Sequence, residues 1–176
     1  MRFCNPLLQS LLTFHPLNSY LCRDPSGQKI VVENNGQSVA GPITNALNML
    51  NDPSKPFSYG LYKFLNDSPQ TIYVKYWPSV GSDGKPRKTD FYSPVIHTIY
   101  IDPCSRRTAP TTEDPDDPVP LQIILAHEMG HARGHLLNDP DQQYDSDYGP
   151  LDDMSNVILN ENPVRAEFGL PARISY

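Results

Sequence analysis

Residues 121–131 of the chain read LQIILAHEMGH, a stretch that combines a helix pattern with two histidines. Apolar residues recur at the i, i+3 and i+4 positions of one helix face, and the four residues before the first histidine are all apolar. The residues Asp116-Asp117-Pro118 stand just upstream, and acids followed by proline are typical of a helix N-terminus. The pattern therefore predicts a buried helix.

The two histidines belong to an H-E-x-x-H motif formed by His127, Glu128 and His131. Histidines four residues apart share one helix face, with Cβ atoms about 6 Å apart, so both imidazoles can bind one Zn²⁺. Glu128 can then reach a water on the metal and act as a general base. Without a metal, a glutamate beside a buried histidine pair would be an uncompensated charge. The motif therefore predicts one Zn²⁺ per chain and metal-assisted hydrolysis.

Catalytic zinc usually has a third protein ligand. His135 lies about 6 Å beyond His131 along the helix axis, too far to share the ion, so we expect an exposed histidine at the helix end. The acidic pair Asp152-Asp153 opens an amphipathic stretch that contains Met154, Val157 and Ile158. One acid of the pair could bind zinc while the other orients a histidine.

Composition limits the other functions. A chain of 176 residues fits one domain, and 38% hydrophobic residues with 19 prolines favour a loop-rich surface. The net charge of −6 argues against a nucleic-acid partner, and no apolar run is long enough to span a membrane. Cys4, Cys22 and Cys104 are widely spaced and odd in number, so we expect no disulfide framework and a reducing compartment.

The remaining pattern predicts an α+β, zincin-like fold, in which a small sheet packs on the H-E-x-x-H helix. Residues 1–24 form an N-terminal segment, for which a flexible and a secretion-related role both stay open, and residues 25–176 form the metallopeptidase domain. We expect a monomer, in which an edge strand holds extended substrate. The expected strands are 28–33, 71–77 and 95–101, the expected helices are 43–50 and 57–65, and the expected loops include 104–119 and 138–150.

The C-terminal residues 161–176 read ENPVRAEFGLPARISY. This tail resembles the E-N-x-x-R-x-E-x-G-x-P-x-R-x-x-Y ending of the NleD-type effector metallopeptidases, bacterial proteins injected into host cells or found as toxin domains. The resemblance covers roughly residues 100–176. Members of that family often carry a Glu-Glu pair ahead of the tail, where this chain has Asp152-Asp153, and Asp is one methylene shorter.

The resemblance implies a secreted zinc endopeptidase that cleaves a narrow set of host proteins in the host cell cytoplasm. Related effectors are associated with cutting stress-activated MAP kinases. Clostridial neurotoxin light chains have a similar site, in which the second acid of the pair binds zinc and an R-x-x-Y pair acts at the transition state. By this analogy Asp153 is the third ligand, Asp152 supports the site, and Arg173 and Tyr176 stabilise the transition state.

Alternatives stay open for the third ligand and for the function, which include a small-molecule hydrolase on the same scaffold. Glu161 and Glu167 are alternative third ligands, and Arg165 is expected only to pair with Glu161 on the helix surface, at i, i+4. The alternative function is a zinc-containing effector that binds a host protein without proteolytic activity. Such a structural zinc would be closed by four protein ligands and would not need Glu128.

Overall fold

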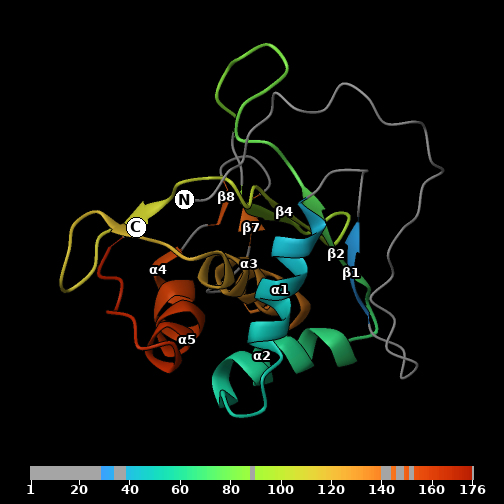
Figure 1. Ribbon diagram of the computed structural model, residues 1–176. Helices are drawn as coiled ribbons and strands as arrows, with labels where there is room; N and C mark the ends of the chain where they lie inside the picture. Colours follow the sequence, from blue (N-terminus) through green and yellow to red (C-terminus); the bar gives the residue numbers. More distant parts are fainter. Residues whose placement is uncertain are drawn as a thin grey trace.

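The computed structural model describes residues 29–33, 39–87, 90–139, 144–145, 149–150 and 153–175. These residues form an α+β fold, as the sequence predicts, in which one small sheet packs with several helices (Figure 1). The N-terminal segment expected over residues 1–24 lies outside the described part of the chain.

The main sheet has four strands: β1 (Ile30–Glu33), β2 (Ile72–Tyr76), β3 (Phe91–Ser93) and β4 (Thr98–Ile101). Their order is β1-β2-β4-β3, with β1, β2 and β4 mutually parallel and β3 antiparallel to β4. Each of the three expected strand ranges contains one of the parallel strands. The sequence did not predict β3, which is only three residues long and lies at the edge of this sheet.

Two helices precede the central one: α1 (Ala40–Leu50) and α2 (Pro56–Asp67) contain the helical ranges expected from the sequence. The C-terminal part of the chain forms α4 (Asp153–Asn156), the π-helix η2 (Val157–Glu161) and α5 (Asn162–Glu167). Two short antiparallel pairs complete the described elements: β5 (Thr108–Ala109) with β6 (Asp117–Pro118), and β7 (Tyr144–Asp145) with β8 (Gly149–Pro150). These pairs lie within ranges expected to be loops.

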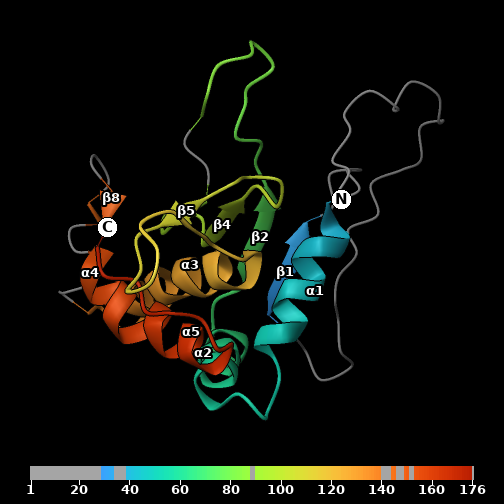
Figure 2. The same ribbon diagram turned by 60° about the vertical axis from the view of Figure 1, so that its left-hand side comes forward.

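Helix α3 (Leu121–Leu136) lies at the centre of the fold and contains the H-E-x-x-H residues. The sheet and the helices α4–α5 lie on opposite sides of it in both views (Figures 1 and 2). Every residue from Ile123 to Ala132 is buried, because α1, α2, η2 and β3 all pack against this helix. Polar groups in this part of α3 therefore need partners within the protein.

The N-terminal end of α3 differs in position from the sequence expectation. The helix begins after Pro120, whose extended backbone precedes it, and the upstream residues Asp117 and Pro118 pair as β6 instead. At the other end, Asn138 takes a positive φ of 51°, a conformation that commonly ends a helix. Arg133 and His135 in the last turn are placed where positive charge interacts favourably with the helix dipole.

Within the described residues, no helix is long and apolar enough to cross a membrane.

Cys104 is disulfide-bonded, so the expectation that the cysteines stay reduced is wrong for this residue. The other two cysteines, Cys4 and Cys22, lie outside the described part of the chain. The cysteine count therefore gives no argument for a reducing compartment.

Candidate metal centre

His127 and His131 project from α3 into the protein interior and turn their rings toward one another. His127 is 4% exposed and His131 is 3% exposed, and their Nε2 atoms are 3.1 Å apart. Two nitrogens bonded to one tetrahedral zinc at the usual bond length lie about 3.3 Å apart. The helix alone thus brings the two nitrogens to the separation that one ion requires.

The protonation of His127 is set by Glu161, a residue of the π-helix η2. The Nδ1 atom of His127 lies 2.9 Å from Oε2 of Glu161, and both side chains are buried. A carboxylate accepts hydrogen bonds only, so the Nδ1 atom of His127 carries a proton, which leaves Nε2 as the ring nitrogen that can offer a lone pair to a metal. That lone pair faces His131, as a metal ligand requires.

Glu161 was one of the alternative third ligands, and the structure places it on the other side of His127. Its carboxylate contacts the ring nitrogen that is not shared with His131. Both of its oxygens are also engaged by arginines: Oε1 accepts from Arg165 at 2.9 Å and Oε2 from Arg173 at 3.1 Å. In this position the carboxylate orients a histidine, an arrangement common around protein-bound zinc.

The surroundings of Glu161 keep its carboxyl group ionised. Burial on its own would raise its pKa, but the hydrogen bond and charge of His127, the charge of Arg173 and the hydrogen bond of Arg165 outweigh burial and lower the pKa to about 2. The carboxylate is therefore available to accept the His127 proton throughout the physiological pH range.

Arg173 reaches this network because the C-terminal segment folds back over the protein. The backbone N–H of Arg173 donates to the Asn162 side chain at 2.8 Å, and Thr112 and Ile174 make backbone hydrogen bonds that tie the segment to the loop around residue 111. The guanidinium then donates to the same Glu161 oxygen that His127 contacts. The structure thus brings Arg173 close to the histidine pair.

Arg165 pairs with Glu161 across one helical turn, as the sequence predicts. The expected surface location is wrong, because Arg165 is fully buried. Its guanidinium also donates to the Pro171 carbonyl at 2.9 Å, which helps to hold the C-terminal segment. Burying this cation is tolerable because Glu161 compensates its charge.

Two buried asparagines, which the sequence analysis did not identify, support the backbone of α3. The side chain of Asn156 donates to the carbonyl oxygen of His127 at 2.8 Å, and Asn160 donates to Asn156 at 2.9 Å. Both asparagines press against Gly130: a Cβ atom at that position would lie 2.0 Å from Asn156 Oδ1 and 2.9 Å from Asn160 Cβ. In the sequence, the glycine between the two histidines is the signal that could have suggested close packing of another segment against α3.

Gly130→Ala should therefore destabilise the protein. Alanine is favoured over glycine inside a helix by about 1 kcal/mol, but overpacking a buried site costs about 1–3 kcal/mol, and Asn156 cannot move without losing its bond to His127. We expect a net loss of about 2 kcal/mol in the free energy of unfolding, measured by urea denaturation. Gly60→Ala in α2 is the matched control, because no atom lies within 4 Å of its added Cβ. Equal stability changes in the two variants would contradict the close contact.

The remaining candidate residues fall into three groups. Glu128 lies on α3 and is 3% exposed. Glu167 lies elsewhere: its two carboxylate oxygens accept from the backbone N–H groups of Phe57 and Ser58, at 2.6 and 2.9 Å, at the N-terminus of α2. Asp152, Tyr176 and the side chain of Asp153 lie outside the described part of the structure. Among the side chains that are described, no group of three His, Cys, Asp or Glu residues gathers to hold a metal.

His135 is half-buried, so the expectation of an exposed histidine is wrong. Its ring centroid lies 6.0 Å from that of Tyr92 in β3 and 5.7 Å from that of His97. Burial and the nearby His97 lower its pKa. These contacts connect the last turn of α3 with the edge strand β3.

Comparison of the chain with protein-family models, curated proteins and solved structures finds no match. The function must therefore be inferred from the geometry of the site and from the tail motif.

Proposed function

We propose that this chain is a zinc-dependent endopeptidase with a zincin-like fold. One observation carries the proposal: the buried Nε2 atoms of His127 and His131 lie 3.1 Å apart, and Glu161 engages the opposite ring nitrogen of His127. With its Nδ1 proton directed to Glu161, His127 turns the lone pair of Nε2 toward His131, and a cation bound between the two Nε2 atoms would replace the hydrogen bond that they make with each other. The donor set of two imidazoles suits zinc.

The arrangement of the sheet supports the substrate class. The antiparallel strand β3 lies at the edge of the described four-stranded sheet, and its Tyr92 contacts the end of α3 through His135. An edge strand has unpaired backbone groups, to which an extended peptide can add as a further strand. A substrate bound along β3 would lie beside the helix that carries the histidines.

The catalytic roles follow from residue chemistry. When bound, zinc supplies a Lewis acid that acidifies water and polarises the scissile carbonyl. Glu128 takes a proton from the attacking water and passes it toward the leaving amine. Arg173, held by Glu161 and Asn162, donates hydrogen bonds to the developing oxyanion, and Tyr176 is its proposed partner through the R-x-x-Y spacing.

We assign Asp153 as the third protein ligand, with Asp152 beside it as a supporting residue. The position of α4 favours this assignment: Asn156, one turn after Asp153, donates to the His127 carbonyl, so the short helix lies against α3. Glu161 and Glu167 are less suitable, because both of their carboxylates already have other partners in the structure.

A zinc-affinity series tests these assignments. Asp153→Asn should lower zinc affinity most of the three carboxyl variants, because it removes a ligand. Glu161→Gln should lower it by about 10–100-fold, the usual effect of losing a carboxylate that orients a histidine. Glu167→Gln should leave it unchanged, since that carboxylate caps α2. Competition with a chromophoric chelator measures all three, and zinc release by Glu167→Gln alone would refute the assignment of Asp153.

The biological setting rests on the tail. Its Glu161 and Arg173 meet His127 at one carboxylate oxygen, so the motif that resembles the NleD-type effectors forms part of the site. We therefore propose a secreted effector that cleaves a narrow set of host proteins in the host cytoplasm, with stress-activated MAP kinases as the first substrates to test. Mass spectrometry of host-cell proteins incubated with wild type and with Glu128→Gln would identify cleavage products that depend on the base. Their absence across the host proteome would refute the proposal.

A further inference from the structure

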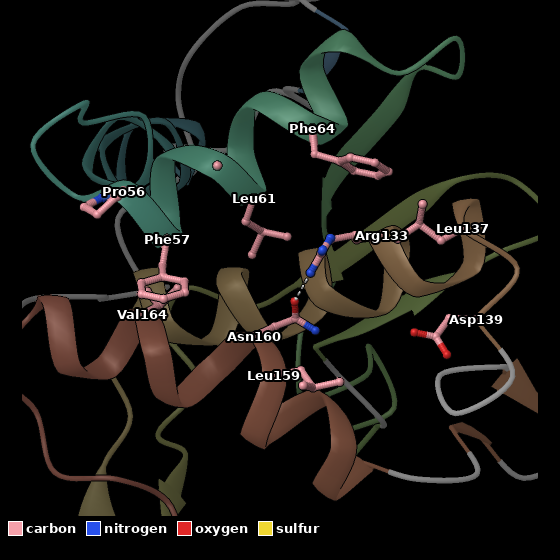
Figure 3. Close-up of a pocket in the computed structure, with 11 residues that line it drawn as sticks. Pro56, Phe57, Leu61, Phe64, Arg133, Leu137, Asp139, Leu159, Asn160 and Val164 are labelled. Atoms are coloured by element: carbon pink, nitrogen blue, oxygen red, sulfur yellow. Dashed lines mark hydrogen bonds between the residues drawn. The ribbon is translucent and has the colours of Figure 1, made fainter.

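A cavity lies beside the C-terminal part of α3, where Arg133 and Leu137 line it. Its volume is about 530 Å³, within the range of small-molecule sites, and neither His127, Glu128 nor His131 lines it. Figure 3 shows it between α2 and the C-terminal helical segment, with α3 behind. Its apolar lining consists of Phe57, Leu61, Phe64, Leu137, Leu159 and Val164.

The apolar lining is unusually exposed. Phe57 of α2 is 60% exposed, Leu159 of η2 is 54% exposed and Leu137, which follows α3, is 52% exposed, and all three line the same cavity. Large apolar side chains left in water favour an apolar ligand, because covering them releases free energy in proportion to the area buried.

One cation lies among these apolar groups. The guanidinium of Arg133 donates to Asn160 Oδ1 at 3.0 Å and lies 5.8 Å from the centre of the Phe64 ring. Within the described residues it forms no ion pair, and a guanidinium has five N–H donors in a planar fork. That fork matches the two oxygens of a carboxylate, so Arg133 can bind one in bidentate geometry.

We propose that this pocket binds a small carboxylate ligand with an unbranched apolar body, such as a medium-chain fatty acid. The carboxylate pairs with Arg133, and the apolar body covers Phe57 and Val164. Asp139 also lines the cavity, but in the view of Figure 3 it lies on the other side of Arg133 from Phe57 and Val164. The head group is thus recognised by Arg133 and repelled from the Asp139 end.

Three probes with the same body and different head groups test the proposal: octanoate, octanol and octylamine, titrated into the full chain by calorimetry. We expect octanoate to bind at least about tenfold more tightly than octanol, since a charge-assisted hydrogen bond adds this much affinity. Octylamine should bind more weakly still. Equal affinities for octanoate and octanol, preference for octylamine, or no octanoate binding would each overturn the proposal.

Variants locate the site independently of any peptidase activity. Arg133→Gln should lower octanoate affinity by about tenfold or more and leave octanol affinity unchanged, whereas Asp139→Asn should not weaken octanoate binding. Phe57→Ala removes an exposed side chain of the cavity wall and should weaken octanoate and octanol equally. Circular dichroism checks that each variant folds. If Arg133→Gln fails to fold, the proposal is tested by Phe57→Ala and by the affinities of the wild type for the three head groups. Unchanged octanoate binding in Phe57→Ala would overturn the placement.

Discussion

Glu128→Gln should lower the rate of peptide hydrolysis by roughly 10²–10⁴-fold, the contribution typical of a positioned general base. Glutamine has nearly the same shape as glutamate but cannot accept a proton from the attacking water. Because Glu128 is proposed as base and not as ligand, zinc content and thermal stability should stay close to wild type. Cleavage products measured by mass spectrometry and zinc measured by atomic emission check the two parts separately.

Glu113→Gln provides the matched control, since it removes one negative charge from an exposed loop position. It should retain full activity. If Glu128→Gln lost its zinc, Glu128 would be structural, and the alternative of a zinc-containing binding protein without proteolytic activity would become preferable. If Glu128→Gln kept full activity, another group would have to act as the base.

The central elements of the fold could be predicted from sequence because their patterns are strong and local. The apolar run before His127 has both the spacing and the length of a buried helix, and the parallel strands are rich in β-branched and aromatic residues. The strand β3 escaped prediction because three residues are too few for an alternating pattern. The pairing of β5 with β6 joins segments that carry no strand pattern of their own.

The C-terminal helical segment shows why part of the site could not be predicted. The sequence favours an amphipathic helix with Val157 and Ile158 on its apolar side, yet Ile158 is 58% exposed while Asn156 is fully buried. Neighbouring residues of a helix point about 100° apart, so Val157 can face the core while Ile158 faces solvent. The wider turn of the π-helix η2 then shifts its later residues relative to an α-helical pattern. This shift accompanies the burial of Asn160 and Glu161 against α3.

The role of Glu161 likewise depends on tertiary structure. Glu161 lies 34 residues after His127, and nothing in the spacing distinguishes a zinc ligand from a carboxylate that orients a histidine. The sequence offers three candidates for the third ligand: Asp153, which the resemblance favours, and the alternatives Glu161 and Glu167. The fold gives two of them other roles: Glu161 contacts Nδ1 of His127, the ring nitrogen that does not face His131, and Glu167 caps α2.

His131→Ala should abolish zinc binding at stoichiometric concentration, and with it hydrolysis. His131 supplies one of the two histidine nitrogens that meet at 3.1 Å, so its removal leaves His127 without this second imidazole. A site with one histidine and one carboxylate lacks the ligands that hold catalytic zinc. Zinc content of protein purified without added metal, measured per chain, should fall from one to near zero.

His135→Ala is the control on the same helix. It removes an imidazole one turn further along, whose ring contacts those of Tyr92 and His97. This variant should keep one zinc per chain. A third variant, His127→Ala, should behave like His131→Ala, since each ring is required.

Equal zinc content in His131→Ala and wild type would show that the ion, if present, binds elsewhere. Loss of zinc from His135→Ala alone would move the site to the last turn of α3, beside the edge strand β3. Loss from all three variants would instead indicate that α3 itself had unfolded, which circular dichroism would detect by its lost helical signal.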